Sequence, residues 1–297
     1  MIDRYGWKQE ADDLMRGLAG GAILGLPLLY TMEMWWHGMT LSEWHLLGIL
    51  GVVLLANFLF SILSGFRDSY SFSSALSESI TSVGIGLLFS AAILALIGEL
   101  SMNASPSENV GKIVLESAAV SIGVCFANAQ VRGRSRTGDD TEEGAGADGQ
   151  SGGKKPGAAE EDLQRLQLQA DFKDAAATGV GATAFALNIA PTEEVLMIAV
   201  RLSPWQQLLI LGASLALCYI ILFASGFEDH QVHVKGIFQH PVAETMLTGA
   251  LSLGVAFVLL WLLGQREAMS HPATAVATVV TLGLPAVVGG AAGRLIV

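Results

Sequence analysis

Apolar runs recur along the chain and are separated by short polar segments. An α-helix needs about 20 apolar residues to cross the roughly 30 Å hydrocarbon core of a bilayer. Eight runs approach or exceed this length, at 14–36, 45–64, 79–98, 110–129, 174–190, 205–225, 242–264 and 274–296. The fifth run has a further apolar stretch to Val200 beyond Pro191. The pattern predicts an all-α membrane fold, a polytopic bundle of eight transmembrane helices.

Residues 31–68 resemble residues 192–229, which lie 161 positions later and align without a gap. The shared positions include a Thr-x-Glu sequence, a Trp and the sequence Ser-Gly-Phe-x-Asp, and Gly98 aligns with Gly264 at an offset of 166. Self-similarity of this kind indicates an internal duplication. Four spans in each copy would insert both copies in the same orientation, so the sequence predicts two parallel four-helix repeats around a pseudo-twofold axis.

The composition supports the membrane class and locates a linker. The chain is 52% hydrophobic and only 14% charged, whereas soluble domains average about 25% charged. Residues 131–170 include a long stretch of Gly, Asp, Glu, Ser and basic residues. We expect a disordered cytoplasmic linker there, between a first repeat with an N-terminal interfacial segment at 1–130 and a second repeat at 171–297. The net charge of -11 makes nucleic acid an unexpected partner.

The basic residues predict the orientation in the membrane. With eight spans and a cytoplasmic N-terminus, only Lys112, Arg201 and Arg266 of the 16 basic residues fall in external segments. An excess of Lys and Arg on the cytoplasmic side is the usual pattern. The sequence therefore predicts a multi-pass protein of the lipid bilayer with both termini in the cytoplasm.

Two equivalent carboxylates in the apolar runs are the leading candidates for chemistry. Glu33 and Glu194 each follow a threonine by two residues, Thr31 and Thr192, and Pro191 can open the helix beside the second pair. An unbroken helix from Arg16 would place Glu33 roughly 25 Å along its axis, near the outer edge of the membrane. We expect the two carboxylates to face the seam, the contact between the repeats, and to bind a proton or a small cation there. The alternative is that Glu33 reaches the lipid headgroups.

Five more acidic residues extend this candidate pathway. They are Glu116, Glu78, Glu244, Asp68 and Asp229. Glu116 has Leu282 as its counterpart, so any role is confined to the first repeat. The other four are predicted to lie near the cytoplasmic helix ends, where an acid also complements the helix dipole or caps the next helix.

Other chemistry has weaker support in the sequence. Cys125 and Cys218 lie inside apolar runs and are expected to be small core residues. His-x-x-His at His230 and His233 lies in a loop and is a weak metal signal. Asn57 and Cys218 are equivalent positions in the middle of a span, which argues against a polar site common to both repeats. No metal, cofactor or catalytic residue is predicted.

The repeated Ser-Gly-Phe-x-Asp and Thr-x-Glu sequences resemble those of an uncharacterised bacterial integral membrane family, catalogued as a domain of unknown function. The resemblance covers both four-span halves and excludes the linker. It implies a bacterial cytoplasmic (inner) membrane and brings no activity or site residue with it.

Three functions remain open at this stage. The first is a channel or carrier for protons or small cations, which the duplicated architecture and the membrane carboxylates favour. The second is a structural or assembly protein without a pathway, for which membrane acids would be unnecessary. The third is an intramembrane enzyme, but no His-Glu-x-x-His sequence is present and Ser64 and Ser225 have no mid-membrane histidine as a base. We therefore expect a transport protein that is not an enzyme, and leave a homo-oligomer open.

Overall fold

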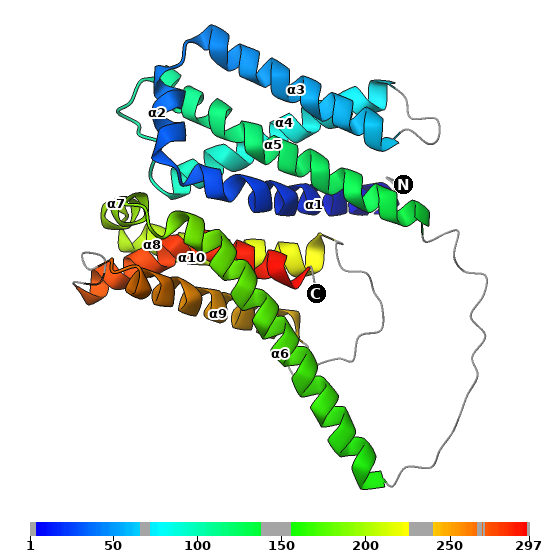
Figure 1. Cartoon of the computed structure of the whole chain (residues 1–297). Coiled ribbons are helices and arrows are strands. Elements are labelled where there is room, and N and C mark those ends of the chain that lie inside the picture. The colour runs from blue at the N-terminus through cyan, green and yellow to red at the C-terminus, as the bar shows by residue number, and fades with distance from the viewer. Residues whose placement is uncertain are drawn as a thin grey trace.

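The computed structural model describes residues 4–65, 72–137, 156–225, 240–265, 269 and 271–295. Over these residues the chain is helical and contains no β-strand. The long helices run roughly alongside one another in two groups, α1–α5 and α6–α10 (Figure 1). The structure confirms the all-α fold that the apolar runs predict.

The two groups contain the same order of long and short helices. The first half, residues 4–137, holds α1 (Arg4–Leu29), α2 (Met32–Thr40), α3 (Glu43–Gly65), α4 (Phe72–Leu96) and α5 (Pro106–Thr137). The second half, residues 156–295, holds α6 (Pro156–Ile189), α7 (Glu194–Arg201), α8 (Pro204–Tyr219), the π-helical turn η1 (Ile220–Ala224), α9 (Pro241–Leu262) and α10 (Pro272–Arg294). A relation between the halves as parallel repeats stays a prediction.

Six of the described helices are long and apolar enough to cross a membrane, and two bent pairs would bring the number to eight. The bends lie between α1 and α2, at 85°, and between α6 and α7, at 89°. The first predicted span, 14–36, is therefore not one straight helix. Pro27 lies inside α1, and the chain turns only at Tyr30 and Thr31. The position predicted for Glu33, roughly 25 Å from Arg16 along one unbroken helix, is therefore wrong.

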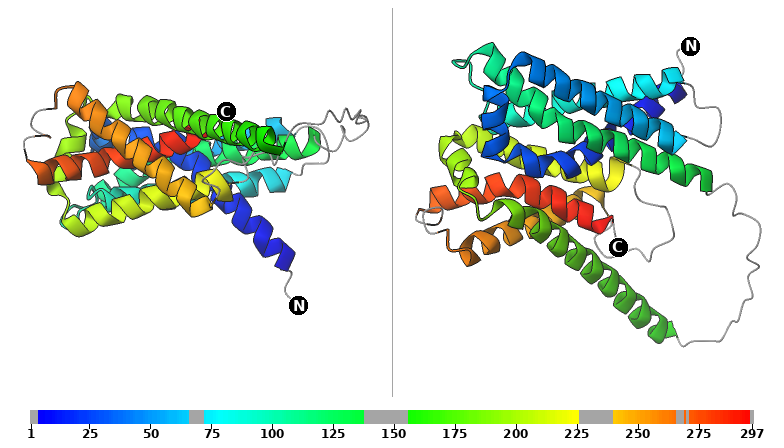
Figure 2. Two further views of the ribbon diagram at one scale, coloured as in Figure 1. Left: turned by 90° about the horizontal axis from the view of Figure 1, so that it is seen from below. Right: turned by 45° about the horizontal axis from the view of Figure 1, so that its top comes forward.

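Helix also extends over residues for which the sequence predicts a disordered linker. α5 continues to Thr137 and α6 begins at Pro156, so 131–137 and 156–170 are helical. The start of α6 projects away from the bundle (Figures 1 and 2). Leu163, Leu166 and Leu168 among charged residues give this part of the sequence its helical character.

Each half packs around one central helix, α5 in the first and α10 in the second. α5 contacts α1, α2, α3 and α4, and α10 contacts α6, α7, α8 and α9. Glycines allow close approach: a methyl group on Gly20 would overlap the carbonyl oxygen of Gly123, and one on Gly181 would overlap that of Gly289. Small residues of this kind bring helix backbones together in membranes, where no hydrophobic effect acts between helices.

The seam between the halves is closed by packing and by polar contacts. A single cluster of buried apolar side chains includes residues of both halves. The Tyr30 hydroxyl donates to the carbonyl oxygen of Thr281 at 3.1 Å, and Arg16 Nε donates to that of Ser225, also at 3.1 Å. Near the α2–α7 end, Arg201 of the second half pairs with Glu99 of the first half at 3.2 Å.

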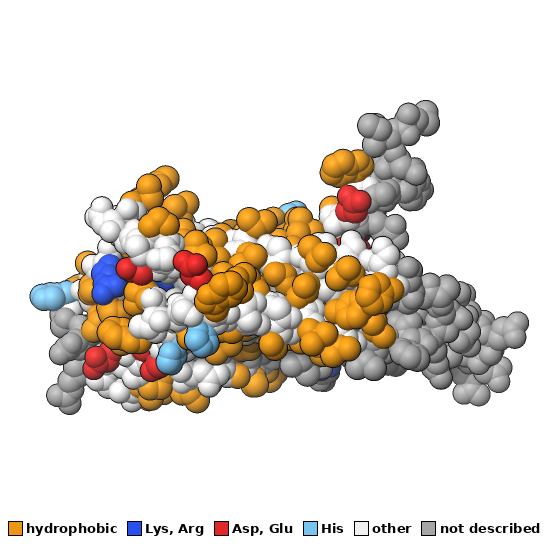
Figure 3. Space-filling model, turned by 90° about the horizontal axis from the view of Figure 1, so that it is seen from above, with side chains coloured by type: hydrophobic (Ala, Val, Ile, Leu, Met, Phe, Trp, Pro, Cys, Tyr) orange, Lys and Arg blue, Asp and Glu red, His pale blue; other side chains and the backbone are white. Residues whose placement is uncertain are grey.

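The surface along the helices is apolar, as a bilayer requires. Figure 3 shows hydrophobic side chains along the length of one face, while most of its charged side chains gather near the end that holds α2 and α7. At that end four tryptophans are exposed, Trp36, Trp44, Trp205 and Trp261. Tryptophan prefers the boundary between membrane and water, so this end lies at one membrane surface.

Candidate functional site

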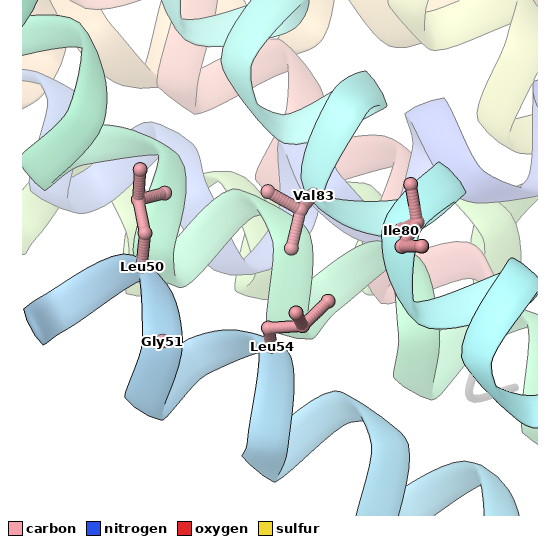
Figure 4. Close-up of a pocket in the computed structure, with 5 residues that line it drawn as sticks. All are labelled: Leu50, Gly51, Leu54, Ile80 and Val83. Atoms are coloured by element: carbon pink, nitrogen blue, oxygen red, sulfur yellow. The ribbon is translucent and has the colours of Figure 1, made fainter. Parts of the chain in front are cut away.

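A shallow pocket of about 250 Å³ lies between α3 and α4, but its lining is aliphatic. Leu50, Gly51 and Leu54 of α3 face Ile80 and Val83 of α4 across it (Figure 4). None of these side chains can hold a charge or a metal, so the chemistry of the protein has to be sought among the polar side chains.

Glu33 lies in the first turn of α2 and is exposed. The helix breaks just before it, and the Thr31 hydroxyl donates to the carbonyl oxygen of Leu28 at 2.7 Å. The backbone N–H of Thr31 donates to the same oxygen at 2.9 Å, so Thr31 supplies two donors to a carbonyl group at the end of α1. His37 and Thr40 are exposed on the same face of α2 as Glu33, so this face is one that water or lipid headgroups can reach.

Glu194 occupies the same place in the second half. It lies in the first turn of α7 and is partly exposed, and the Thr192 hydroxyl donates to the carbonyl oxygen of Ile189 at 2.7 Å. The helix break beside Pro191 that the sequence indicates is present. However, α2 packs on α5 whereas α7 packs on α10, so the two carboxylates lie on short helices that pack in different halves.

Glu116 is the most deeply buried carboxyl group in the described chain. It lies in the membrane-spanning part of α5, Pro106–Asn128, its side chain is 0% exposed, and neither oxygen has a hydrogen-bond partner among the described residues. On the same face of α5, one turn after Glu116, Val120 packs on Gly25 of α1. One turn before Glu116, the backbone of Lys112 packs on Gly38 of α2. Glu116 thus lies beneath the corner between α1 and α2.

At the end of the bundle opposite α2 and α7, Glu244 forms an ion pair with an arginine of the protein. Arg294, at the end of α10, pairs with Glu244 at 3.1 Å and with Asp174 at 2.8 Å, and also donates to the Thr248 hydroxyl at 3.2 Å. Glu78 of α4 is partly buried near the start of its helix. Asp68, Asp229, His230 and His233 lie outside the described residues.

The sequence did not predict the ion-pair cluster at the α2–α7 end. Glu99 is 8% exposed and contacts both Lys112, at 3.4 Å, and Arg201, at 3.2 Å. Lys112 Nζ also donates to the backbone carbonyl of Glu99 at 2.9 Å. Glu99 follows α4 and Lys112 lies 13 positions later, in α5, but Arg201 lies 102 positions beyond Glu99. No local pattern could therefore have revealed the whole cluster.

The apolar surface and the six to eight candidate spans define a multi-pass integral membrane protein. The chain belongs to the family described as "Putative integral membrane protein (DUF2391)", whose model matches residues 13–297. The match confirms the family to which the resemblance pointed. No curated protein and no solved structure matches the chain.

Proposed function

We propose that this protein moves protons or small cations across the membrane, and that Glu116 is the group that binds the proton. The observation that supports this most strongly is the burial of the Glu116 carboxyl group in α5, with no partner for either oxygen in the described part of the chain. Ionisable side chains within membrane spans are rare, and proton relays are one of their common roles.

The electrostatics of this position favour a group that loads and unloads a proton. An ionised carboxylate without a partner is very costly in an apolar interior, whereas the protonated acid is much less so. Glu116 can therefore hold a proton while it is buried and release it when water or a base reaches it. Such a change in access is the essential event in a proton carrier.

Glu33 and Glu194 have a supporting role in this proposal. They lie in the first turns of α2 and α7 and are at least partly exposed, so they raise the local concentration of cations at the outer surface rather than hold an ion in the membrane. Thr31 and Thr192 support the two helix breaks. Glu78 and Glu244 are assigned to the opposite, inner end, where Glu244 is neutralised by Arg294.

The proposal includes an orientation and a symmetry. We infer a bacterial cytoplasmic membrane with both chain ends on the cytoplasmic side, which is supported by Arg16 and Arg294 at the end remote from α2 and α7. We infer that the halves are parallel repeats, because the equivalent pairs Gly20–Gly123 and Gly181–Gly289 make the same close contact. Gly98 and Gly264 also share a positive φ, 77° and 71°. No catalytic residue is assigned.

Ion flux in proteoliposomes tests the proposal. Purified protein is reconstituted with an internal pH dye, gradients of H⁺, Na⁺, K⁺ and Ca²⁺ are imposed in turn, and flux is compared with that of empty vesicles. We expect a proton flux that Glu116→Gln reduces to the level of empty vesicles, because glutamine cannot release a proton. Glu108→Gln on the same helix removes a carboxylate outside the buried region and should leave flux unchanged.

The double variant Glu33→Gln/Glu194→Gln tests the role of the two carboxylates at the outer surface. We expect it to lower flux by about threefold at low salt and by less at high salt, because exposed charges are screened. Wild-type protein that gives no flux under any gradient would contradict transport. Full flux in Glu116→Gln would remove Glu116 from the mechanism.

A further inference from the structure

Polar side chains line the contact between α3, α4 and α5 inside the first half. On α3 and α5, Cys125 Sγ lies 3.5 Å from the backbone oxygen of Asn57 and 3.6 Å from Ser61 Oγ. On α4, Gly86 packs against Ser121 of α5, and Ser90 lies one turn from Gly86 on the same face. All of these side chains other than the glycine are buried.

Two of these buried groups have no hydrogen-bond partner among the described residues. Asn57 is 2% exposed and its Nδ2 is unpartnered, and Ser90 is 0% exposed with an unpartnered Oγ. The Oδ1 atom of Asn128, near the inner end of the same contact, is buried and unpartnered as well. A buried polar group without a partner is costly, and bound water is the usual partner where protein supplies none.

The corresponding contact in the second half is less polar on two of its three helices. Asn57 and Ser61 of α3 align with Cys218 of α8 and Leu222 of η1. Ser121 and Cys125 of α5 align with Val287 and Ala291 of α10. α4 and α9 do not differ in this way, because Ser82 and Thr248 are both polar and Ser252 of α9 is buried with an Oγ that is unpartnered among the described residues. The contrast therefore comes from the other two helices. The inner end of the second-half contact holds the Arg294 side chain, paired with its acids, where the first half has Asn128.

We propose that the α3–α4–α5 contact of the first half binds a chain of water molecules that reaches from the inner end of α5 to the middle of the membrane. From Asn128 to Ser117 this chain would be roughly 16 Å long at 1.5 Å per residue. It ends at the level of Glu116, next to Ser117 in sequence. The role of this water as the inner access route for a proton rests on the proposed function, but its presence does not.

The two native cysteines are matched reporters of this water. Cys125 lies in the proposed water chain, and Cys218 lies at the position equivalent to Asn57 in the second half. Neither cysteine is in a disulfide, and both are buried. Ag⁺ reacts with thiols and travels through water, not through hydrocarbon. Protein in vesicles is exposed to Ag⁺ from the inner face, quenched and unfolded, and the remaining free thiol at each cysteine is then quantified by mass spectrometry.

We expect Cys125 to react at least about tenfold faster than Cys218, because a thiol in a dry contact reacts only during rare local opening. Asn57→Leu and Ser121→Val, which place apolar side chains in the chain of water, should each slow Cys125 several-fold without changing the rate at Cys218. Thermal unfolding of each variant establishes that it is folded.

Equal rates at the two cysteines, whether fast or slow, would overturn the proposal. So would an unchanged Cys125 rate in both folded variants. Rapid reaction of Cys125 in a protein that shows no ion flux would support the water chain and refute transport. Ion flux through a protein whose Cys125 does not react would support transport and refute the water chain.

Discussion

The two halves share an order of helices but differ in what they bury. In the first half, α5 buries Glu116 with neither oxygen partnered in the described residues. In the second half, Leu282 takes that position and is equally buried, and Arg294, at the end opposite α2 and α7, pairs with Asp174 and Glu244. The comparison predicts a division of roles between carboxyl groups, with one that is buried and unpartnered among the described residues of the first half and two that Arg294 pairs in the second half.

The largest expected effect follows removal of Arg294. In Arg294→Leu, Asp174 and Glu244 would lose their counter-charge, and breaking such a pair from one side is strongly destabilising. Asp174 is about half exposed, so we expect a loss of about 3 kcal/mol, at the low end of the range for buried pairs. Tryptophan fluorescence during thermal unfolding in detergent measures the change.

Asn128→Leu is the matched control in the first half. It removes an amide whose buried oxygen is unpartnered, so stability should change by less than about 0.5 kcal/mol or rise slightly. A loss of stability as large as that in Arg294→Leu would show that both halves depend on polar contacts at these equivalent positions. It would contradict the proposed division of roles.

The glycine contacts should be equally important in both halves. Gly20→Val and Gly181→Val each force a side chain into the backbone of the central helix, and overpacking of this kind costs about 2 kcal/mol. We expect the two losses in thermal unfolding to agree within about 0.5 kcal/mol. A large loss in one half only would contradict the inferred equivalence of the repeats.

Replacement of Glu116 by leucine, the residue at the equivalent position of the second half, tests the effects of this carboxyl group on stability and on ion flux separately. Glu116→Leu removes a buried carboxyl group that has no hydrogen-bond partner in the described part of the chain, so we expect the protein to gain about 1 kcal/mol while proton flux is lost. Leu282→Glu, the reverse change at the equivalent position, should destabilise. A destabilised Glu116→Leu protein would show that this carboxyl group is engaged in the folded state, and would weaken its assignment as a proton-binding group.

The sequence predicts the helical class well because apolar runs of about 20 residues have few other solutions in a membrane. It also indicates the break at Pro191, where a backbone donor is missing. The matching break at Thr31 has no proline at that point, and there the backbone N–H and the hydroxyl of Thr31 both donate to the carbonyl oxygen of Leu28. Sequence alone identifies Glu116 as unusual, but its lack of partners depends on how α1 and α2 fold over α5.

Contacts between distant segments were the least predictable part. Glu99, Lys112 and Arg201 meet because the ends of α4, α5 and α7 converge, and nothing in their spacing fixes that geometry. The water chain proposed for the first half is a similar case, because it depends on the rotation of three helices that bring Asn57, Ser90 and Cys125 toward one contact.

The smallest expected effect concerns the ion pair that joins the two halves near the α2–α7 end. Arg201 is 57% exposed in its pair with Glu99, so Arg201→Gln should cost only about 0.5 kcal/mol, and less in high salt. Lys112 is 10% exposed in its own pair with Glu99. Lys112→Met would leave the buried Glu99 carboxylate, among the described residues, with the largely exposed Arg201 as its cationic partner. We therefore expect Lys112→Met to cost clearly more than Arg201→Gln in thermal unfolding at both low and high salt. The opposite order would show that the contact between the halves, rather than packing within the first half, sets the stability of this end of the bundle.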